Sequence, residues 1–96
     1  MSTKAELEER LRSLKPHIAQ QFNVRSIGYF GSFARGEQTE QSDIDLLVEF
    51  SVTPGWEFAD LKMYLEEQLQ REVDLVTYGA LRPQMRESIL SQVRYV

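Results

Sequence analysis

Residues 30–50 read FGSFARGEQTEQSDIDLLVEF and combine a small-residue turn, Gly31-Ser32, with two aspartates inside an apolar run. The apolar run predicts a buried strand from Ile44 to Phe50. Asp43 and Asp45 are two positions apart, so both side chains are expected on the same face of that strand. Buried carboxylates cost free energy unless a positive group compensates them. The stretch therefore predicts a strand of the sheet and a cation beside it.

A third carboxylate lies in a similar setting further along the chain. Asp74 stands within EVDLVT, residues 72–77, which predicts another strand. If this strand is a neighbour of the one that follows Asp43, three carboxylates converge, and they cannot all stay charged without a counterion. A divalent cation supplies it, and an all-oxygen ligand set suits Mg²⁺, which prefers one or two carboxylates together with substrate phosphates and water.

The turn before the aspartates has the features of a phosphate-binding segment. Gly31 follows a predicted strand and allows the backbone to approach a phosphate closely. Ser32 offers a hydroxyl, and the first amides of the following helical turn offer unpaired donors. Arg35 is positioned to cover a negatively charged tail. A phosphate cradle that faces a Mg²⁺ site is suited to phosphoryl or nucleotidyl transfer.

The remaining elements predict an α+β fold with a mixed sheet and helices packed on it. The first amphipathic helix is expected to end near Gln20, with a kink or an early break at Pro16. A strand over Val24 to Phe30 follows it. Apolar spacing predicts a second helix from Phe58 to Leu69, and Pro83 opens a last helix.

Length and composition indicate one small domain, residues 1–96. No apolar stretch approaches the roughly 20 residues of a membrane span, and the start has no signal-peptide core. Without an export signal or a cysteine, we expect a cytoplasmic protein. The net charge is −4 and the basic residues are scattered among acids. This balance argues against long nucleic acid as a direct partner, though not against a single nucleotide.

Other catalytic chemistries have little support in the sequence. A cysteine–histidine dyad is excluded because the chain has no cysteine. A triad built on Ser32 would have to use the only histidine, His17, which is expected to be an ordinary residue of the first helix.

The motifs together resemble the nucleotidyltransferase superfamily that includes DNA polymerase beta. The resemblance rests on GSFARG, on the ten residues from Phe33 to Ser42, on SDIDLLVEF and on VDLV. It is strongest to the smallest branch, the minimal nucleotidyltransferases, which are antitoxins of toxin–antitoxin pairs whose toxin carries a HEPN domain. It extends over nearly the whole chain and implies the nucleotidyltransferase fold.

The resemblance also implies roles for individual residues. Gly31 and Ser32 would hold the β- and γ-phosphates of a nucleoside triphosphate. The carboxylates of Asp43 and Asp45 would bind Mg²⁺, and Asp74 would join them at the catalytic metal and help to activate the incoming hydroxyl. The arginine of the family motif matches Arg35. All three carboxylates are present, which is the pattern of an active enzyme.

The implied reaction is transfer of AMP from ATP to a tyrosine hydroxyl of the HEPN toxin, in a hetero-oligomer with that toxin. Two alternatives remain open. An antitoxin could neutralise by binding alone, with Trp56, Phe58 and Tyr64 in its interface, although these residues are expected in the core or half-buried. A transferase acting on a small molecule, such as an aminoglycoside, is disfavoured because no second domain is present to hold that substrate.

Overall fold

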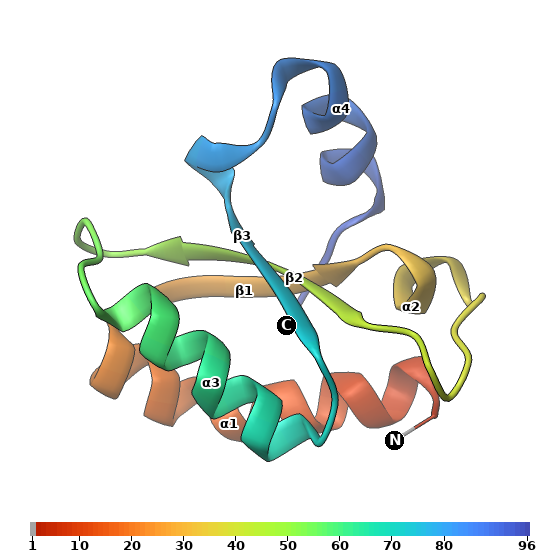
Figure 1. Ribbon diagram of the computed structural model, residues 1–96, viewed down its shortest axis with the longest axis horizontal. Coiled ribbons are helices and arrows are strands. Elements are labelled where there is room, and N and C mark those ends of the chain that lie inside the picture. Colours follow the sequence, from red (N-terminus) through yellow and green to blue (C-terminus); the bar gives the residue numbers. More distant parts are fainter. Residues whose placement is uncertain (1) are drawn as a thin grey trace.

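The computed structural model describes residues 2–96, which build a four-stranded mixed sheet in the order β3-β2-β1-β4 (Figure 1). Strand β1 (Val24–Phe30) pairs antiparallel with both β2 (Ile44–Phe50) and β4 (Arg94–Tyr95). Strand β3 (Val73–Thr77) pairs parallel with β2. The α+β class is confirmed, and β1 and β2 have the predicted bounds.

Helices cover the two faces of the sheet unequally (Figure 1). Helices α1 (Lys4–Phe22) and α3 (Glu57–Leu69) lie side by side on one face and enclose the main core. A single helix, α4 (Pro83–Gln92), packs over the other face through a small apolar cluster that includes Phe30, Leu47 and Ile89. The short helix α2 (Ser32–Arg35) directly follows β1, and a 3₁₀ turn, η1 (Tyr78–Ala80), follows β3.

Helix α1 differs from the prediction at Pro16. The expected early break was wrong, because α1 continues through Pro16 to Phe22, and a kink at this proline stays a prediction. Leu11 and Ile18, on either side of the proline, are completely buried against the sheet. Each buried side chain of this size contributes about 1.5–3 kcal/mol, which offsets the hydrogen bond that a proline removes from a helix.

Strand β4 was not predicted, because two residues are too short to show a strand pattern. It pairs with Gly28 and Tyr29 of β1. A Cβ atom at Gly28 would lie 2.9 Å from the carbonyl oxygen of Arg94, so the glycine permits this close pairing. The end of the chain is thereby fixed at the edge of the sheet.

Among residues 2–96, no helix combines the length and the apolar character that crossing a membrane requires.

Candidate active site

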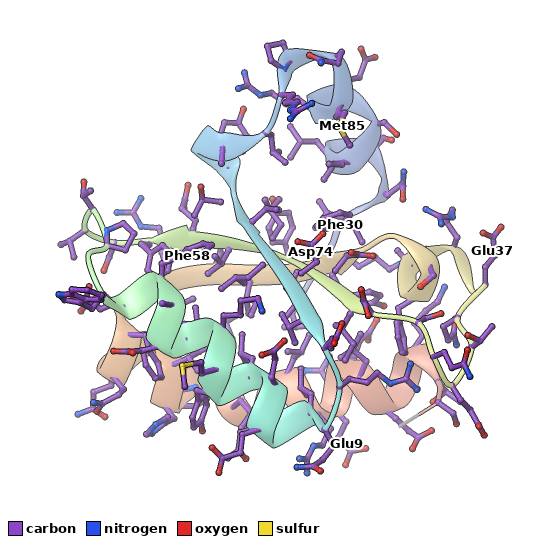
Figure 2. The ribbon with its side chains drawn as sticks, in the orientation of Figure 1. Glu9, Phe30, Glu37, Phe58, Asp74 and Met85 are labelled. Carbon is purple, nitrogen blue, oxygen red and sulfur yellow. The ribbon has the colours of Figure 1, made fainter. Side chains whose placement is uncertain are left out.

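Two of the predicted carboxylates are brought together by the parallel pairing of β2 with β3. Asp45 of β2 lies directly opposite Asp74 of β3. Both side chains leave the sheet face that points away from the main core, and Figure 2 shows Asp74 on the side of the sheet where Phe30 and α4 lie. The predicted neighbourhood of these two strands is confirmed.

Asp43 occupies a different setting from the one expected. Strand β2 begins at Ile44, so Asp43 belongs to the preceding turn and is exposed. The prediction that Asp43 and Asp45 lie on the same strand was therefore wrong. The backbone N–H of Ile44 donates to the carbonyl of Glu72, 3.0 Å away, which ties this end of β2 to the residue before β3. Asp43 thus stands at the edge of the carboxylate pair.

The environment of Asp45 makes its charged form unfavourable. Burial is the main cause that raises the pKa of this carboxyl to about 6, and the negative charges of Asp74 and Asp43 raise it further. The positive charge of Arg35 acts in the opposite direction. A carboxyl that is crowded by two other carboxylates and only half-buried is suited to a cation that neutralises all of them.

The raised pKa of Asp45 predicts a pH dependence of stability in the metal-free protein. In the folded chain this pKa is about 6, against 3.8 when unfolded. Between these values the folded state holds the proton more tightly, so this group lowers the free energy of unfolding as pH rises from about 4 to 6. Above that range the loss stays constant. Allowing for the partial exposure of the group, the loss is about 1–2 kcal/mol.

Urea unfolding in EDTA between pH 4.5 and 7.5 tests this dependence. Asp45→Asn should gain stability relative to the native chain as pH rises, and the gain should level off above pH 6. Glu49→Gln is the matched control, because Glu49 is an exposed carboxylate on the same strand. Parallel curves for Asp45→Asn and the native chain would contradict the prediction.

Gly31 is closely packed against Asp45. Its φ is 72° and its ψ is −145°, a backbone conformation that residues other than glycine rarely adopt. A Cβ atom built on Gly31 would lie 2.1 Å from Oδ2 of Asp45. Only glycine allows the turn after β1 to approach the carboxylate this closely. Ser32, which begins α2, is half-buried beside it.

Two open cavities meet at Asp74. The first, of about 550 Å³, lies between Gly31, Asp45 and α4. The second, of about 710 Å³, lies at the corner between α3 and β3 and is lined by Asp43 and Lys62. Asp74 lines both. The carboxylates therefore separate a space beside the glycine turn from a space beside α3.

Arg35 belongs to the first cavity and links the glycine turn to α4. Its Nε donates to Oε1 of Glu37 at 3.0 Å, and its Nη1 donates to Oε1 of Gln92 at 3.1 Å. The side chain is about half exposed and lines the cavity with Asp45. A cation at this position can meet an anionic ligand without losing a buried partner.

The donor set is suited to Mg²⁺ in one particular way. Within residues 2–96, no group of three or more His, Cys, Asp or Glu side chains is arranged so that it could hold a metal ion. A cage of three carboxylates is thus not preformed, and metal binding by Asp43, Asp45 and Asp74 stays a prediction. Mg²⁺ usually takes one or two carboxylates together with substrate phosphates and water, and the paired Asp45 and Asp74 fit that mode.

The sequence did not predict the contribution of α4 to the site. The side chains of Gln84, Ser88 and Gln92 line the cavity beside Gly31. They carry no motif, because their place over the sheet follows from the packing of Ile89 against Phe30 and Leu47.

The residues considered for other roles lie away from the carboxylates. His17 is exposed on α1 and packs against Tyr64, with 5.0 Å between the ring centroids. Phe58 and Tyr64 are partly buried, as expected. The expectation for Trp56 was wrong, since this residue is 85% exposed.

A strand, a Gly-Ser turn and a short helix face a pair of strand carboxylates, as the resemblance to nucleotidyltransferases implied. The chain belongs to the nucleotidyltransferase domain family, whose sequence profile matches residues 5–96. It is 41% identical over 97 residues to the protein adenylyltransferase MntA of Thermococcus cleftensis, covering 100% of this chain and 98% of that protein.

Solved structures have the same fold. One, provisionally described as a minimal nucleotidyltransferase, is 34% identical with a TM-score of 0.82, and the match covers 96% of this chain and 94% of the other. Another is a toxin–antitoxin structure with AMP-PNP, which is 25% identical with a TM-score of 0.68. That match covers 96% of this chain and 70% of the other.

Proposed function

We propose that this nucleotidyltransferase is an antitoxin that transfers AMP from ATP to a tyrosine hydroxyl of a HEPN-domain toxin and so neutralises it. The observation that carries the proposal is the register of Asp45 with Asp74 beside the glycine turn at Gly31. The choice of AMP and of a protein acceptor is supported by the related adenylyltransferase MntA. The toxin partner is supported by the family resemblance and by the similar toxin–antitoxin structure.

In this proposal the triphosphate lies in the cavity beside Gly31. The backbone of Gly31 and the hydroxyl of Ser32 hold the β- and γ-phosphates, because no side chain at position 31 keeps them away. Arg35 offers its exposed guanidinium to the same phosphates. These contacts orient the α-phosphate toward the carboxylates, which is where the reaction takes place.

The carboxylates of Asp43, Asp45 and Asp74 would hold Mg²⁺ together with the phosphates. Mg²⁺, when bound, supplies positive charge that stabilises the transferring phosphoryl group and the leaving pyrophosphate. The ion would also remove the repulsion that raises the pKa of Asp45. The carboxylates would therefore contribute by holding the positive ion beside the reacting atoms.

In this proposal Asp74 acts on the acceptor. Its side chain is exposed and lines both cavities, so a tyrosine of the partner that enters from the α3 side would reach it. A bond forms between the tyrosine oxygen and the α-phosphorus, and the bond between the α-phosphorus and the bridging oxygen breaks. Pyrophosphate leaves, and the carboxylate of Asp74 accepts the tyrosine proton. The proposed compartment is the cytoplasm, where ATP and Mg²⁺ are supplied together.

Label transfer tests the proposed reaction directly. The protein is incubated with Mg²⁺ and host lysate, or with its purified toxin, and ATP labelled at the α-phosphate is compared with ATP labelled at the γ-phosphate. We expect one protein to be labelled from the α-phosphate only, and the Asp43→Asn variant to lose the label. Label from the γ-phosphate would identify a kinase and contradict the mechanism.

Neutralisation by binding alone is the second candidate, and the exposure of Trp56 favours it. Together with Val52, which is 57% exposed, Trp56 places apolar surface on the connection between β2 and α3. The absence of any label, with a stable toxin complex still formed, would support this candidate.

A further inference from the structure

We propose that Arg71 is a positioning residue that fixes the turn carrying Asp43 and thereby sets the affinity of the site for Mg²⁺. Residues 39–43 are called the Asp43 turn below. The inference rests on the proposed function for its metal, but the hold of Arg71 on this turn is a property of the chain itself. Arg71 lies between α3 and β3, three residues before Asp74.

Arg71 binds two backbone carbonyls of the Asp43 turn. Its Nη1 donates to the carbonyl of Thr39 and to that of Ser42, at 2.8 Å in each case. The turn is already closed on itself, because the N–H of Ser42 donates to the carbonyl of Thr39 and the N–H of Thr39 donates to Oγ of Ser42. Arg71 therefore holds a compact turn as one unit.

Arg71 and the next residue, Glu72, together bind both neighbours of Asp43. Arg71 binds the carbonyl of Ser42 on one side, and Glu72 accepts from the N–H of Ile44 on the other. Asp43 itself lies outside the pairing of β2 with β3, which begins at Ile44. The contacts of residues 71 and 72 thus help to keep the carboxylate of Asp43 near Asp45, whose pKa its negative charge raises.

Arg71 also contacts the helix that follows the glycine turn. Its guanidinium carbon lies 5.2 Å from the ring centroid of Phe33, within the range of a cation–π contact. Phe33 is completely buried and directly follows Ser32. One side chain therefore joins α2, the helix proposed to bind the phosphates, to the turn of Asp43, and this connection would align the two halves of the site.

Binding of an unreactive nucleotide measures this role without turnover. The probe is α,β-methylene-ATP, titrated by calorimetry with and without Mg²⁺. In Arg71→Met we expect the gain in affinity that Mg²⁺ gives to fall by about 10-fold or more, with metal-free binding unchanged, as for other groups that orient metal ligands. Arg71→Lys should be intermediate, because lysine keeps donors for the carbonyls but lacks the planar group that stacks on Phe33.

Hydrogen exchange of the metal-free proteins provides the second measurement. Protection of the amides of Ser42 and Ile44 should fall in Arg71→Met. Arg10→Met is the matched control, since Arg10 also donates to a backbone carbonyl, that of Gln68, at a cavity away from the carboxylates. The control should leave both the Mg²⁺ dependence and the exchange at residues 39–44 unchanged.

The outcomes separate this inference from the proposed function. Native Mg²⁺ dependence and native exchange in Arg71→Met would overturn the positioning role. If Mg²⁺ does not strengthen analogue binding to the native chain, the proposed function fails, and the exchange measurement still supports or rejects the hold of Arg71 on the Asp43 turn.

Discussion

Replacing Asp45 with Asn is expected to reduce AMP transfer by roughly 10³-fold or more while the fold remains at least as stable at pH 7. The carboxylate of Asp45 lies between Gly31 and Asp74. Its charge therefore acts at the point where the phosphates and Mg²⁺ would meet. Asparagine keeps the shape of the side chain but removes the repulsion that raises the pKa of Asp45. Activity and stability are thus expected to change in opposite directions.

Rates of α-label transfer to the purified toxin, measured beside thermal unfolding, check both halves of this prediction. Glu49→Gln removes a charge from the same strand and should change neither the rate nor the stability appreciably. A large fall in melting temperature for Asp45→Asn would contradict a metal-binding role, because it would show that the charged carboxylate stabilises the empty fold.

The same variants distinguish modification from binding as the means of neutralisation. If Asp43→Asn combined with Asp45→Asn abolishes neutralisation but still forms the toxin complex, transfer of AMP is the active step. If the double variant still protects cells, the toxin is masked, and the exposed surface at Trp56 becomes the place to substitute next.

Gly31→Ala is expected to lower the free energy of unfolding by about 3 kcal/mol and to abolish transfer. A side chain at this φ and ψ costs about 1–3 kcal/mol, and the added methyl group would overlap Oδ2 of Asp45. Relief of that overlap requires Asp45 to move away from Asp74 or the turn to move away from the sheet. Either movement separates the Gly31-Ser32 turn, which is proposed to bind the phosphates, from the carboxylates.

Gly36→Ala is the matched control for this prediction. Gly36 also has a positive φ, 73°, but its ψ of 23° lies in the less restrictive left-handed helical region, and nothing lies within 4 Å of the position of an added Cβ atom. In Gly36→Ala the free energy of unfolding should therefore fall by about 1 kcal/mol, which is the strain of the left-handed backbone alone. A thermal shift of about 10–20 °C for Gly31→Ala against about 5 °C for Gly36→Ala is the expected result. Equal shifts would show that the contact with Asp45 is unimportant.

Much of this arrangement could be predicted because the local signals were strong. The apolar alternation around Asp45 and Asp74 identified two strands, and the parallel pairing observed between them brings the carboxylates together as expected. The glycine turn at Gly31 was recognisable because a glycine that directly follows a strand allows the backbone to approach a phosphate closely. These are properties of short segments, which periodicity and residue type describe well.

The unpredicted parts depend on contacts between distant segments. Arg71 reaches the Asp43 turn across 29 residues of chain, and nothing in its own neighbourhood marks it. The register of β4 with Gly28 is equally invisible in a two-residue strand. The strand was predicted to begin at Ile44, as observed, but its two-residue alternation was extended to Asp43, which lies outside the pairing. The tertiary contacts of residues 71 and 72 determine that boundary.

The parallel pairing of β2 with β3 also keeps Asp45 opposite Asp74 when the chain changes elsewhere. The distance between Asp45 and Asp74 is set by strand register and does not depend on the length of the connection through α3. Insertions in the exposed segment of residues 51–56 should therefore be tolerated, whereas a single-residue deletion within β3 would turn Asp74 into the core. A reporter domain or affinity tag placed in that segment would leave the pairing of Asp45 with Asp74 intact.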